Sequence, residues 1–302
     1  MYHIACNIDS KYTRFCGVLM VSVFENNKDE AIKVHVLGDG LTQKDKNDLQ
    51  DIASSYGNSV VFYDVDDDMF QKFPVNDQWP RVIYYRLILP SLVEPDVDRV
   101  LYVDCDIIFR GPIKELMEVD LKNNTVAAVE DVFSHFLSYV YPLGYKPTDW
   151  YFNSGVILID VKRWKNRNIT NRCLEFIQNN KVTHPDQDAL NAVLHDSWLR
   201  VSNRWNFLSN YHVTYLNMTM CKMDMDKSYP YYPIICHFTG QKPWDSRCRS
   251  PFKSEFFEYQ KKTIWLNCIP KHSMGERIHQ VLAILLEKIK IKKRNPYYKY
   301  DI

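Results

Sequence analysis

The sequence predicts an α/β fold in which a single Rossmann-like mixed sheet is flanked by helices. Short apolar runs alternate with longer polar-faced stretches over residues 3–65. The runs VHVL and VVFY are continuously apolar, as is typical of strands buried on both faces of a sheet. Between these runs, Thr42 opens T-Q-K-D, a capping-box pattern that predicts the start of a helix. Open sheets of this class bind ligands beyond the carboxyl ends of their strands.

The predicted elements follow one another in chain order. Strands are expected at residues 3–8, 33–40 and 60–65, separated by polar-faced helices over 12–26 and 42–56. Gly38 and Gly40 mark the end of the second strand. Further strands are expected at 99–109, 125–131, 152–161 and 232–238, and further helices at 84–89, 163–179 and 186–194. With no internal repeat or long linker, residues 1–265 are predicted to form one catalytic domain.

The composition excludes several classes of protein. A net charge of +1 argues against a general nucleic-acid binder. The eight cysteines include no C-x-x-C pair, which excludes the usual zinc-finger spacing. The opening MYHIACNID has no leader-like pattern, and no apolar run approaches the roughly 20 residues of a membrane span. We therefore expect a cytoplasmic protein with reduced thiols.

Residues 266–302 differ in character and form a predicted C-terminal helical appendage. An apolar stripe at helical spacing is followed by the basic, tyrosine-rich KIKIKKRNPYYKY; the stripe contains Ile278, Val281, Leu282, Leu285 and Ile289. One interpretation is that the stripe docks on the domain. The other is that it lies on an anionic membrane surface, which basic residues interleaved with aromatic ones favour. The second interpretation places the protein peripherally on the inner face of the cytoplasmic membrane.

Aspartates two residues apart are common in this chain, and most such pairs are expected to be solvated turns. The pair Asp104 and Asp106 differs because apolar runs, VLYV and IIF, flank it on both sides. Unpaired charges are costly to bury, so these carboxylates need partners. In an extended chain their side chains point to the same side, while Cys105 points away. Two oxygen ligands that leave room for phosphate oxygens suit Mg²⁺ or Mn²⁺.

A third ligand is predicted at His237, at the end of the apolar run IICHF. An imidazole ligand shifts the preference from Mg²⁺ towards Mn²⁺. Gly240 and Lys242 follow within five residues. A glycine permits close approach of the backbone, and an ammonium neutralises negative charge, so together they predict a diphosphate site.

With these motifs, the sequence resembles the family 8 retaining glycosyltransferases from about residue 2 to 250. This family includes bacterial galactosyl- and glucosyltransferases of lipopolysaccharide synthesis, with glycogenin as a distant relative. The resemblance rests on motifs in the right order: HIACNIDSKY, YYRLILP at 84–90, RVLYVDCDIIF at 99–109, YFNSGVILID at 151–160, HPDQDALN at 184–191, RWNF at 204–207 and HFTGQKPW at 237–244. It implies a GT-A fold, a UDP-hexose donor, a glycan or glycolipid acceptor, and Mn²⁺ on Asp104, Asp106 and His237.

The resemblance also implies roles for individual residues. The first strand lines the nucleoside pocket, through Ala5, Cys6, Asn7, Asp9 and Tyr12. The opening CNIDSKY is one residue longer than the family pattern A-D-D-x-Y, so the residue that meets the uracil ring is either Asn7 or Asp9. The other implied donor-binding residues are Arg86, Asp104, Cys105, Asp131, Asn153, Ser154, Gly240 and Lys242, and the implied catalytic residues are Gln187, Asp186, Asp131 and Arg86.

The motif at 184–191 bears on the mechanism. Retention by double displacement needs a carboxylate nucleophile near the anomeric carbon. By analogy Gln187, a poor nucleophile, lies nearest, with Asp186 beside it. We therefore expect front-face attack by the acceptor hydroxyl in a hexosyltransferase that moves galactose or glucose to lipopolysaccharide or another surface glycan. The alternatives are a nucleotidyltransferase, a non-catalytic binder of nucleotide sugars, and a self-glucosylating enzyme that resembles glycogenin.

Overall fold

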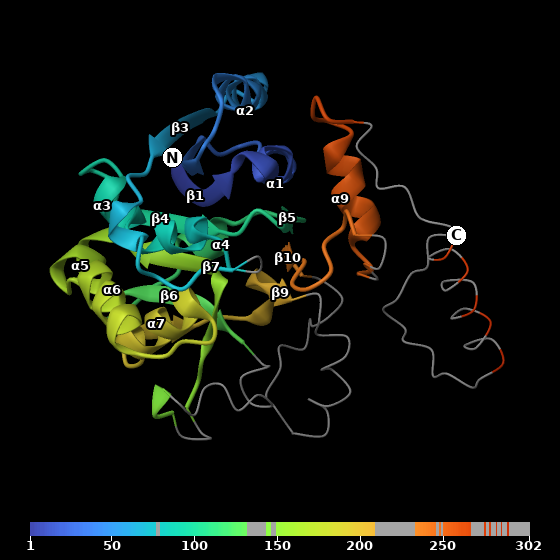
Figure 1. Ribbon diagram of the computed structural model, residues 1–302. Helices are drawn as coiled ribbons and strands as arrows, with labels where there is room; N and C mark the ends of the chain where they lie inside the picture. The colour runs from blue at the N-terminus through green and yellow to red at the C-terminus, as the bar shows by residue number, and fades with distance from the viewer. Residues whose placement is uncertain are drawn as a thin grey trace.

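The computed structural model describes residues 1–76, 79–131, 143–145, 149–208, 233–245, 248, 250–266, 275, 278, 282, 285 and 289. Their core is a seven-stranded mixed sheet with the order β3-β2-β1-β4-β7-β6-β8 (Figure 1). The strands are β1 (Tyr2–Asp9), β2 (Ile32–Asp39), β3 (Ser59–Asp64), β4 (Arg99–Val103), β6 (Val126–Glu130), β7 (Phe152–Asp160) and β8 (Trp198–Arg200). All neighbours pair in parallel except β7, which runs antiparallel to both β4 and β6. The predicted α/β class is confirmed.

A second, three-stranded sheet joins β5 (Ile107–Phe109), β10 (Ile235–His237) and β9 (Phe207–Leu208). The predictions of a single sheet and of one strand over 99–109 were therefore wrong. After Val103 the chain leaves the large sheet, and at Ile107 it enters the small one, where β5 pairs antiparallel with β10. The segment 104–106 is the connection between the two sheets.

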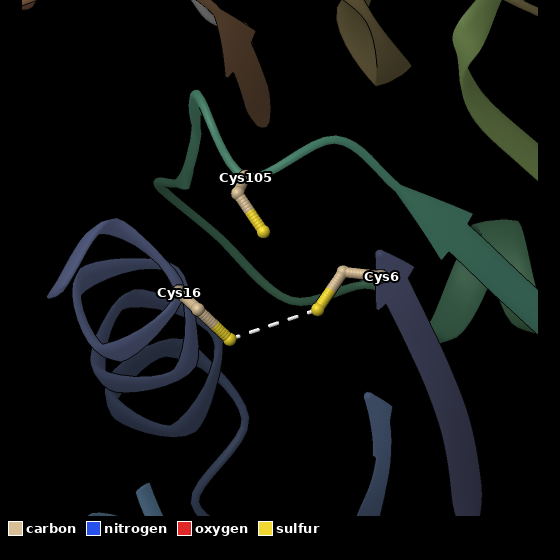
Figure 2. A group of neighbouring side chains, drawn as sticks. All are labelled: Cys6, Cys16 and Cys105. Atoms are coloured by element: carbon tan, nitrogen blue, oxygen red, sulfur yellow. Dashed lines mark hydrogen bonds between the residues drawn. The ribbon is translucent and has the colours of Figure 1, made fainter. Parts of the chain in front are cut away.

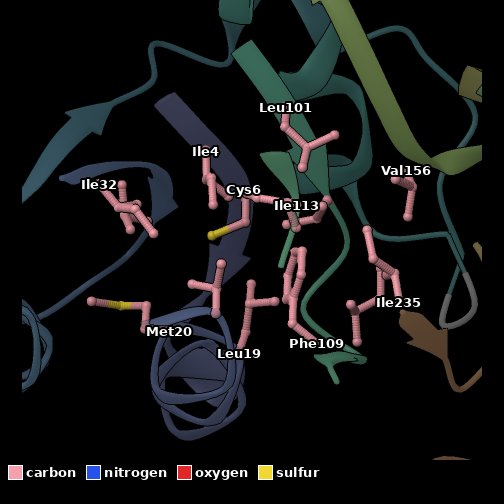
Figure 3. Packing of buried hydrophobic residues seen from close by; sticks show 14 of the residues in the cluster. Ile4, Cys6, Leu19, Met20, Ile32, Leu101, Phe109, Ile113, Val156 and Ile235 are labelled. Atoms are coloured by element: carbon pink, nitrogen blue, oxygen red, sulfur yellow. The ribbon is translucent and has the colours of Figure 1, made fainter. Parts of the chain in front are cut away.

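On one face of the large sheet lie α1 (Thr13–Asn26) and α2 (Gln43–Ser55), and α9 (Lys253–Gln260) packs on α1. The predicted capping box at Thr42 is confirmed, because its hydroxyl accepts the amide of Asp45 and the Asp45 carboxylate accepts the amide of Thr42. The prediction of a polar-faced helix over 12–26 was wrong. Every residue from Phe15 to Phe24 is buried, since α1 lies between β1 and β5 on one side and α9 on the other. Figure 3 shows Leu19 and Met20 of α1 in this core.

The opposite face carries a second apolar cluster, formed with η3 (Arg81–Leu87), α3 (Leu89–Leu92), α5 (Val161–Asn166), α6 (Ile169–Asn179) and α7 (Pro185–Leu194). The helix predicted at 84–89 is a 3₁₀-helix over 81–87. The single helix predicted over 163–179 is divided into α5 and α6, because Asn168 adopts a left-handed conformation with φ of 52°. The shorter elements are η1 (Ser10–Tyr12), η2 (Asp68–Phe70), α4 (Lys114–Met117) and η6 (Asn203–Trp205).

Six cysteines lie among the described residues, and all are buried free thiols, as predicted. Cys221 and Cys268 lie outside the described residues. The described part of the chain contains no helix that is both long and apolar enough to span a bilayer. Of the predicted appendage beyond residue 266, five residues are described.

Candidate active site

The three predicted metal ligands come together at the junction of the two sheets. Asp104 follows the carboxyl end of β4, Asp106 precedes β5, and His237 ends β10. One side-chain ligand atom from each lies within 4.8 Å of the others. The His237 Nε2 atom is 3.3 Å from Oδ1 of Asp106 and 3.8 Å from Oδ2 of Asp104. The carboxylates thus converge across a bend between two sheets rather than along one strand, and the Cys105 side chain is buried beneath them.

Asn206 orients the imidazole of His237. Its Nδ2 group donates to Oδ1 of Asn153 at 2.9 Å, so its own Oδ1 is the atom that faces Nδ1 of His237, at 3.1 Å. Nδ1 is therefore the nitrogen that donates to Asn206, and Nε2 is the nitrogen that faces the two carboxylates and is available to a metal ion. This is the usual arrangement of a metal-binding histidine. Sequence reasoning assigned no role to Asn206, although it lies in the motif RWNF.

Gly155 provides the room for this group. Its carbonyl accepts the amide of Asp104 at 2.9 Å. A Cβ atom at this position would lie 2.3 Å from Cε1 of His237 and 2.8 Å from Oδ2 of Asp104. Only glycine leaves the histidine and carboxylate in place, so the residues are shaped around a shared centre. Sequence reasoning also missed Gly155, which follows Asn153 and Ser154 in the motif YFNSG.

Arg86 of η3 connects the metal-ligand group to α7. It donates to Oδ1 of Asp104 and to the carbonyl of Ser154, both at 2.9 Å, and pairs with Oδ2 of Asp186 at 3.1 Å. Burial alone would lower the pKa of Arg86, but the carboxylates of Asp104 and Asp186 outweigh burial and raise its pKa. This guanidinium is therefore a fixed positive charge at the edge of the site.

The first turn of α7 supplies Asp186 and Gln187. The Oε1 atom of Gln187 accepts the amide of Ser154 at 2.9 Å, and its Nε2 group donates to Oδ2 of Asp131 at 3.1 Å. Asn153 donates to the same Asp131 oxygen at 3.3 Å and to Oε1 of Gln187 at 3.2 Å. The structure thus joins Asp131, Asn153, Ser154, Asp186 and Gln187 in one buried hydrogen-bond network.

The pair Asp186 and Asp188 is an exception to the expectation that most aspartate pairs are solvated turns. Their residue exposures are 3% and 1%. Asp186 accepts from Ser154 Oγ at 2.9 Å, and burial raises the pKa of its carboxyl. Asp188 accepts the Tyr151 hydroxyl at 2.6 Å and the backbone amide of His184 at 3.0 Å. Asp188 therefore anchors the helix whose first turn presents Asp186 to the site.

Lys242 and Gly240 lie beyond β10, as the sequence predicted. The Lys242 ammonium contacts the Asp106 carboxylate and donates to the carbonyl of Phe238 at 3.1 Å. Burial opposes the charge on Asp106, but Lys242 and His237 outweigh it and hold the pKa of this carboxyl below its usual range. Gly240 has φ of 80°, a conformation that strongly favours glycine.

The residues predicted to line the nucleoside pocket from the first strand differ in their surroundings. Ala5 and Cys6 are fully buried, on opposite faces of the sheet, so their side chains belong to the core. The Asn7 amide donates to the carbonyl of Val82 at 2.8 Å, and Asp9 accepts the amide of Tyr12 at 3.2 Å while capping η1. Both Asn7 and Asp9 remain alternatives for a contact with a nucleobase.

Tyr102 connects the first strand to the metal-ligand group, and Tyr12 packs in an aromatic cluster. The Tyr102 hydroxyl joins Asn7 to Asp104, with 2.8 Å to Oδ1 of Asp104. Tyr12 packs edge-on against Trp244. Trp244 itself is stacked on Phe15 with ring centroids 3.4 Å apart.

The fold and this site have clear counterparts among known proteins. The crystal structure of the galactosyltransferase LgtC in complex with donor and acceptor sugar analogues superposes with a TM-score of 0.77 at 26% identity, covering 91% of this chain and 99% of that one. General stress protein A of Bacillus subtilis (strain 168) is 32% identical over 273 residues, which are 87% of this chain and 94% of that protein. The lipopolysaccharide 1,3-galactosyltransferase of Salmonella typhimurium is 28% identical over 88% of this chain and 80% of its own length.

The arrangement of the sheets and the site define a glycosyltransferase with the GT-A fold. The model of the glycosyl transferase family 8 matches residues 3–248. The chain belongs to this family.

Proposed function

We propose that the chain is a retaining hexosyltransferase that moves galactose or glucose from a UDP-sugar to a glycan of the lipopolysaccharide type. The observation that carries this proposal is the network from Asp104 through Arg86 and Asp186 to Ser154, Gln187 and Asp131. In this network, candidate metal ligands lie beside amide and carboxylate groups. Such groups are able to bind sugar hydroxyls. The likeness to LgtC, solved with donor and acceptor sugar analogues, supports the same conclusion.

The residues fit a divalent cation, for which we propose Mn²⁺, with Mg²⁺ as the alternative. Two carboxylates, an imidazole with its Nε2 atom facing them, and a glycine that leaves space make a suitable donor set. When bound, the ion neutralises negative charge on the diphosphate leaving group. Lys242, which already pairs with Asp106, adds a second positive charge on the same side of the site.

The contacts of Asp186 support front-face attack by the acceptor hydroxyl. Its Oδ2 atom is shared between Ser154 and Arg86, and the residue is 3% exposed. A carboxylate committed to these two partners is a poor nucleophile. Gln187 is held on both its oxygen and its nitrogen, and an amide is a poor nucleophile, so the role proposed for it is to bind the sugar rather than to attack it. The leaving phosphate oxygen would accept the proton of the acceptor hydroxyl.

A panel of UDP-sugars tests the proposal and its rivals together. We expect the wild type with Mn²⁺ to release UDP from one sugar, and both a chelator and Asp106→Ala to abolish the release. Formation of UTP and sugar 1-phosphate when diphosphate is supplied with the UDP-sugar would indicate a nucleotidyltransferase instead. Sugar added to the protein itself, seen as a rise in intact mass, would indicate self-glucosylation. Binding without turnover, with every acceptor glycan supplied, would indicate a non-catalytic binder.

For the C-terminal appendage we propose attachment to an anionic membrane surface, which would place the enzyme peripherally at the inner face of the cytoplasmic membrane. The described apolar residues Ile278, Leu282, Leu285 and Ile289 are 49–61% exposed, although they share one helical face. Exposure of all four favours an external surface over docking on the domain. The lysine-rich sequence that follows matches the charge of an anionic leaflet.

Vesicle co-sedimentation of the full chain tests this attachment. We expect binding to vesicles that contain phosphatidylglycerol and weak binding to vesicles of phosphatidylcholine alone. The double variant Leu282→Asp with Leu285→Asp should lose binding. Unchanged binding of that variant would contradict the proposal, whereas UDP release measured on the same samples tests the transferase separately.

A further inference from the structure

Three buried thiols converge beneath the connection that carries Asp104 and Asp106. They are Cys6 of β1, Cys16 of α1 and Cys105 of the β4–β5 connection, and Figure 2 shows them pointing toward one another. The Sγ atoms of Cys6 and Cys16 are 3.6 Å apart, and all three Sγ atoms lie within 4.8 Å of one another. Three different elements thus place one sulfur each at a common point.

A fourth sulfur adjoins the group. The Sδ atom of Met20, one helical turn after Cys16, is 3.9 Å from Cys16 Sγ. Met20 and Cys6 are seen in the same part of the core in Figure 3. Met20, Cys6 and Cys16 are fully buried, and Cys105 is 5% exposed. The immediate surroundings therefore offer soft sulfur ligands.

An isolated buried cysteine is usually a small apolar residue. The described cysteines 173, 236 and 248 fit that account, because none belongs to a cluster of candidate ligands. The group at Cys6, Cys16 and Cys105 differs in its spacing. With metal–sulfur bonds of about 2.3 Å, three sulfurs around one ion lie about 4 Å apart. This is close to the 3.6 Å between Cys6 and Cys16 and lies within the 4.8 Å that contains all three sulfurs.

We propose that Cys6, Cys16 and Cys105 form a binding site for one soft monovalent cation of the Cu⁺ class, separate from the divalent site above it. Thiolate and thioether ligands select such ions. Net charge is costly to bury in an apolar core. When a monovalent ion binds, one thiol gives its proton to solvent, and the resulting thiolate balances the charge of the ion. The site therefore stays neutral, which favours a monovalent ion. Neither sulfur nor copper changes oxidation state in this step. Divalent zinc would need a second thiolate and prefers four ligands.

The proposed site is coupled by position to the transferase site. Cys105 lies between Asp104 and Asp106, so an ion on its sulfur fixes the connection that holds both carboxylates. Cys105 is also the least buried of the three cysteines.

Anaerobic titration with Cu⁺ against a competing chelator tests the proposal. We expect Cys16→Ala to bind one fewer tightly held Cu⁺ than the wild type. Cys173→Ala is the matched control, because it truncates an equally buried thiol outside the group, and it should bind as the wild type does. Cys221 and Cys268 are present in all three proteins and contribute an equal background.

Two further measurements make the result decisive. Thermal unfolding of both variants confirms that they fold. X-ray absorption at the copper edge should show a sulfur-only shell near 2.3 Å in the wild type, and one that is weaker in Cys16→Ala. Equal stoichiometry in the wild type and Cys16→Ala, or an equal loss in Cys173→Ala, would overturn the proposal.

Discussion

The Nδ1 atom of His237 lies 3.1 Å from the Oδ1 atom of Asn206, and this contact fixes which imidazole nitrogen faces Asp104 and Asp106. Removing such a partner usually lowers metal affinity by about 10–100-fold. We therefore predict that Asn206→Ala weakens Mn²⁺ binding by about this factor, as measured by calorimetric titration. Asn206→Asp keeps an oxygen towards Nδ1 but loses the amide that donates to Asn153, so it should recover only part of the affinity. Wild-type affinity in Asn206→Ala would show that the ring is held by other contacts.

Gly155→Ala should disrupt the same group by crowding. Its new Cβ would lie 2.3 Å from His237 Cε1, a contact that forces the buried ring to move. We predict the loss of metal-dependent UDP release, together with Mn²⁺ binding weakened by more than tenfold. Gly111→Ala is the control, because its Cβ would meet Ile234 at an ordinary 3.6 Å. If both variants behave alike, the crowding argument fails.

Asp186→Asn distinguishes front-face attack from double displacement. The amide keeps an acceptor for Ser154 but gives up the ion pair with Arg86, so we expect activity to fall by on the order of 10–100-fold. Loss of a true nucleophile costs about a million-fold in a well-studied hydrolase. Intact-mass measurement of the wild type with donor and no acceptor should show no glycosyl adduct. An adduct on Asp186, or a loss of activity near the larger factor, would establish the covalent route.

His35 should make the stability of the protein depend on pH. It is fully buried in β2, with its Nδ1 atom 2.9 Å from the Tyr63 hydroxyl and its Nε2 atom 2.9 Å from His3. Burial, with a smaller contribution from His3, lowers the pKa of His35 to about 4. Since its unfolded pKa is about 6.5, this stabilisation is complete above that pH and is lost as the pH falls towards 4.

Urea unfolding measures this effect. Between about pH 7 and pH 5, the wild type should lose about 2 kcal/mol more than His35→Gln. Tyr63→Phe is the control, because it removes the hydroxyl that contacts His35 but keeps the imidazole. It should retain the wild-type pH dependence. Parallel pH profiles for the wild type and His35→Gln would contradict the assignment.

The sequence predicted six of the seven strands of the large sheet, all except β8, and the grouping of Asp104, Asp106 and His237, because both depend on local patterns. Continuous apolar runs indicate buried strands, and a pair of carboxylates between two such runs indicates a site. The order of the strands and the antiparallel direction of β7 depend on pairings between distant segments. The same is true of the small sheet, whose strands β5 and β10 are separated by more than a hundred residues.

Residues that act through a partner were the ones that sequence reasoning missed. Nothing in RWNF indicates that Asn206 would face an imidazole thirty-one positions away. Gly155 has an ordinary strand conformation, so its role depends on neighbours from β4 and β10. Helix α1 was taken for a polar-faced helix, because the packing of α9 on its outer side comes from a segment more than two hundred residues later.

Asp104 and His237 lie at the ends of strands that belong to different sheets, and this has a mechanical consequence. Asp104 extends from β4 of the large sheet, and His237 belongs to β10 of the small one. Any ligand bound by both side chains links the two sheets, so part of its binding free energy goes into restricting the motion of the small sheet. Amide hydrogen exchange in β10 and β5 should therefore slow when such a ligand is bound. Local rigidity would then report on occupancy before any sugar is transferred.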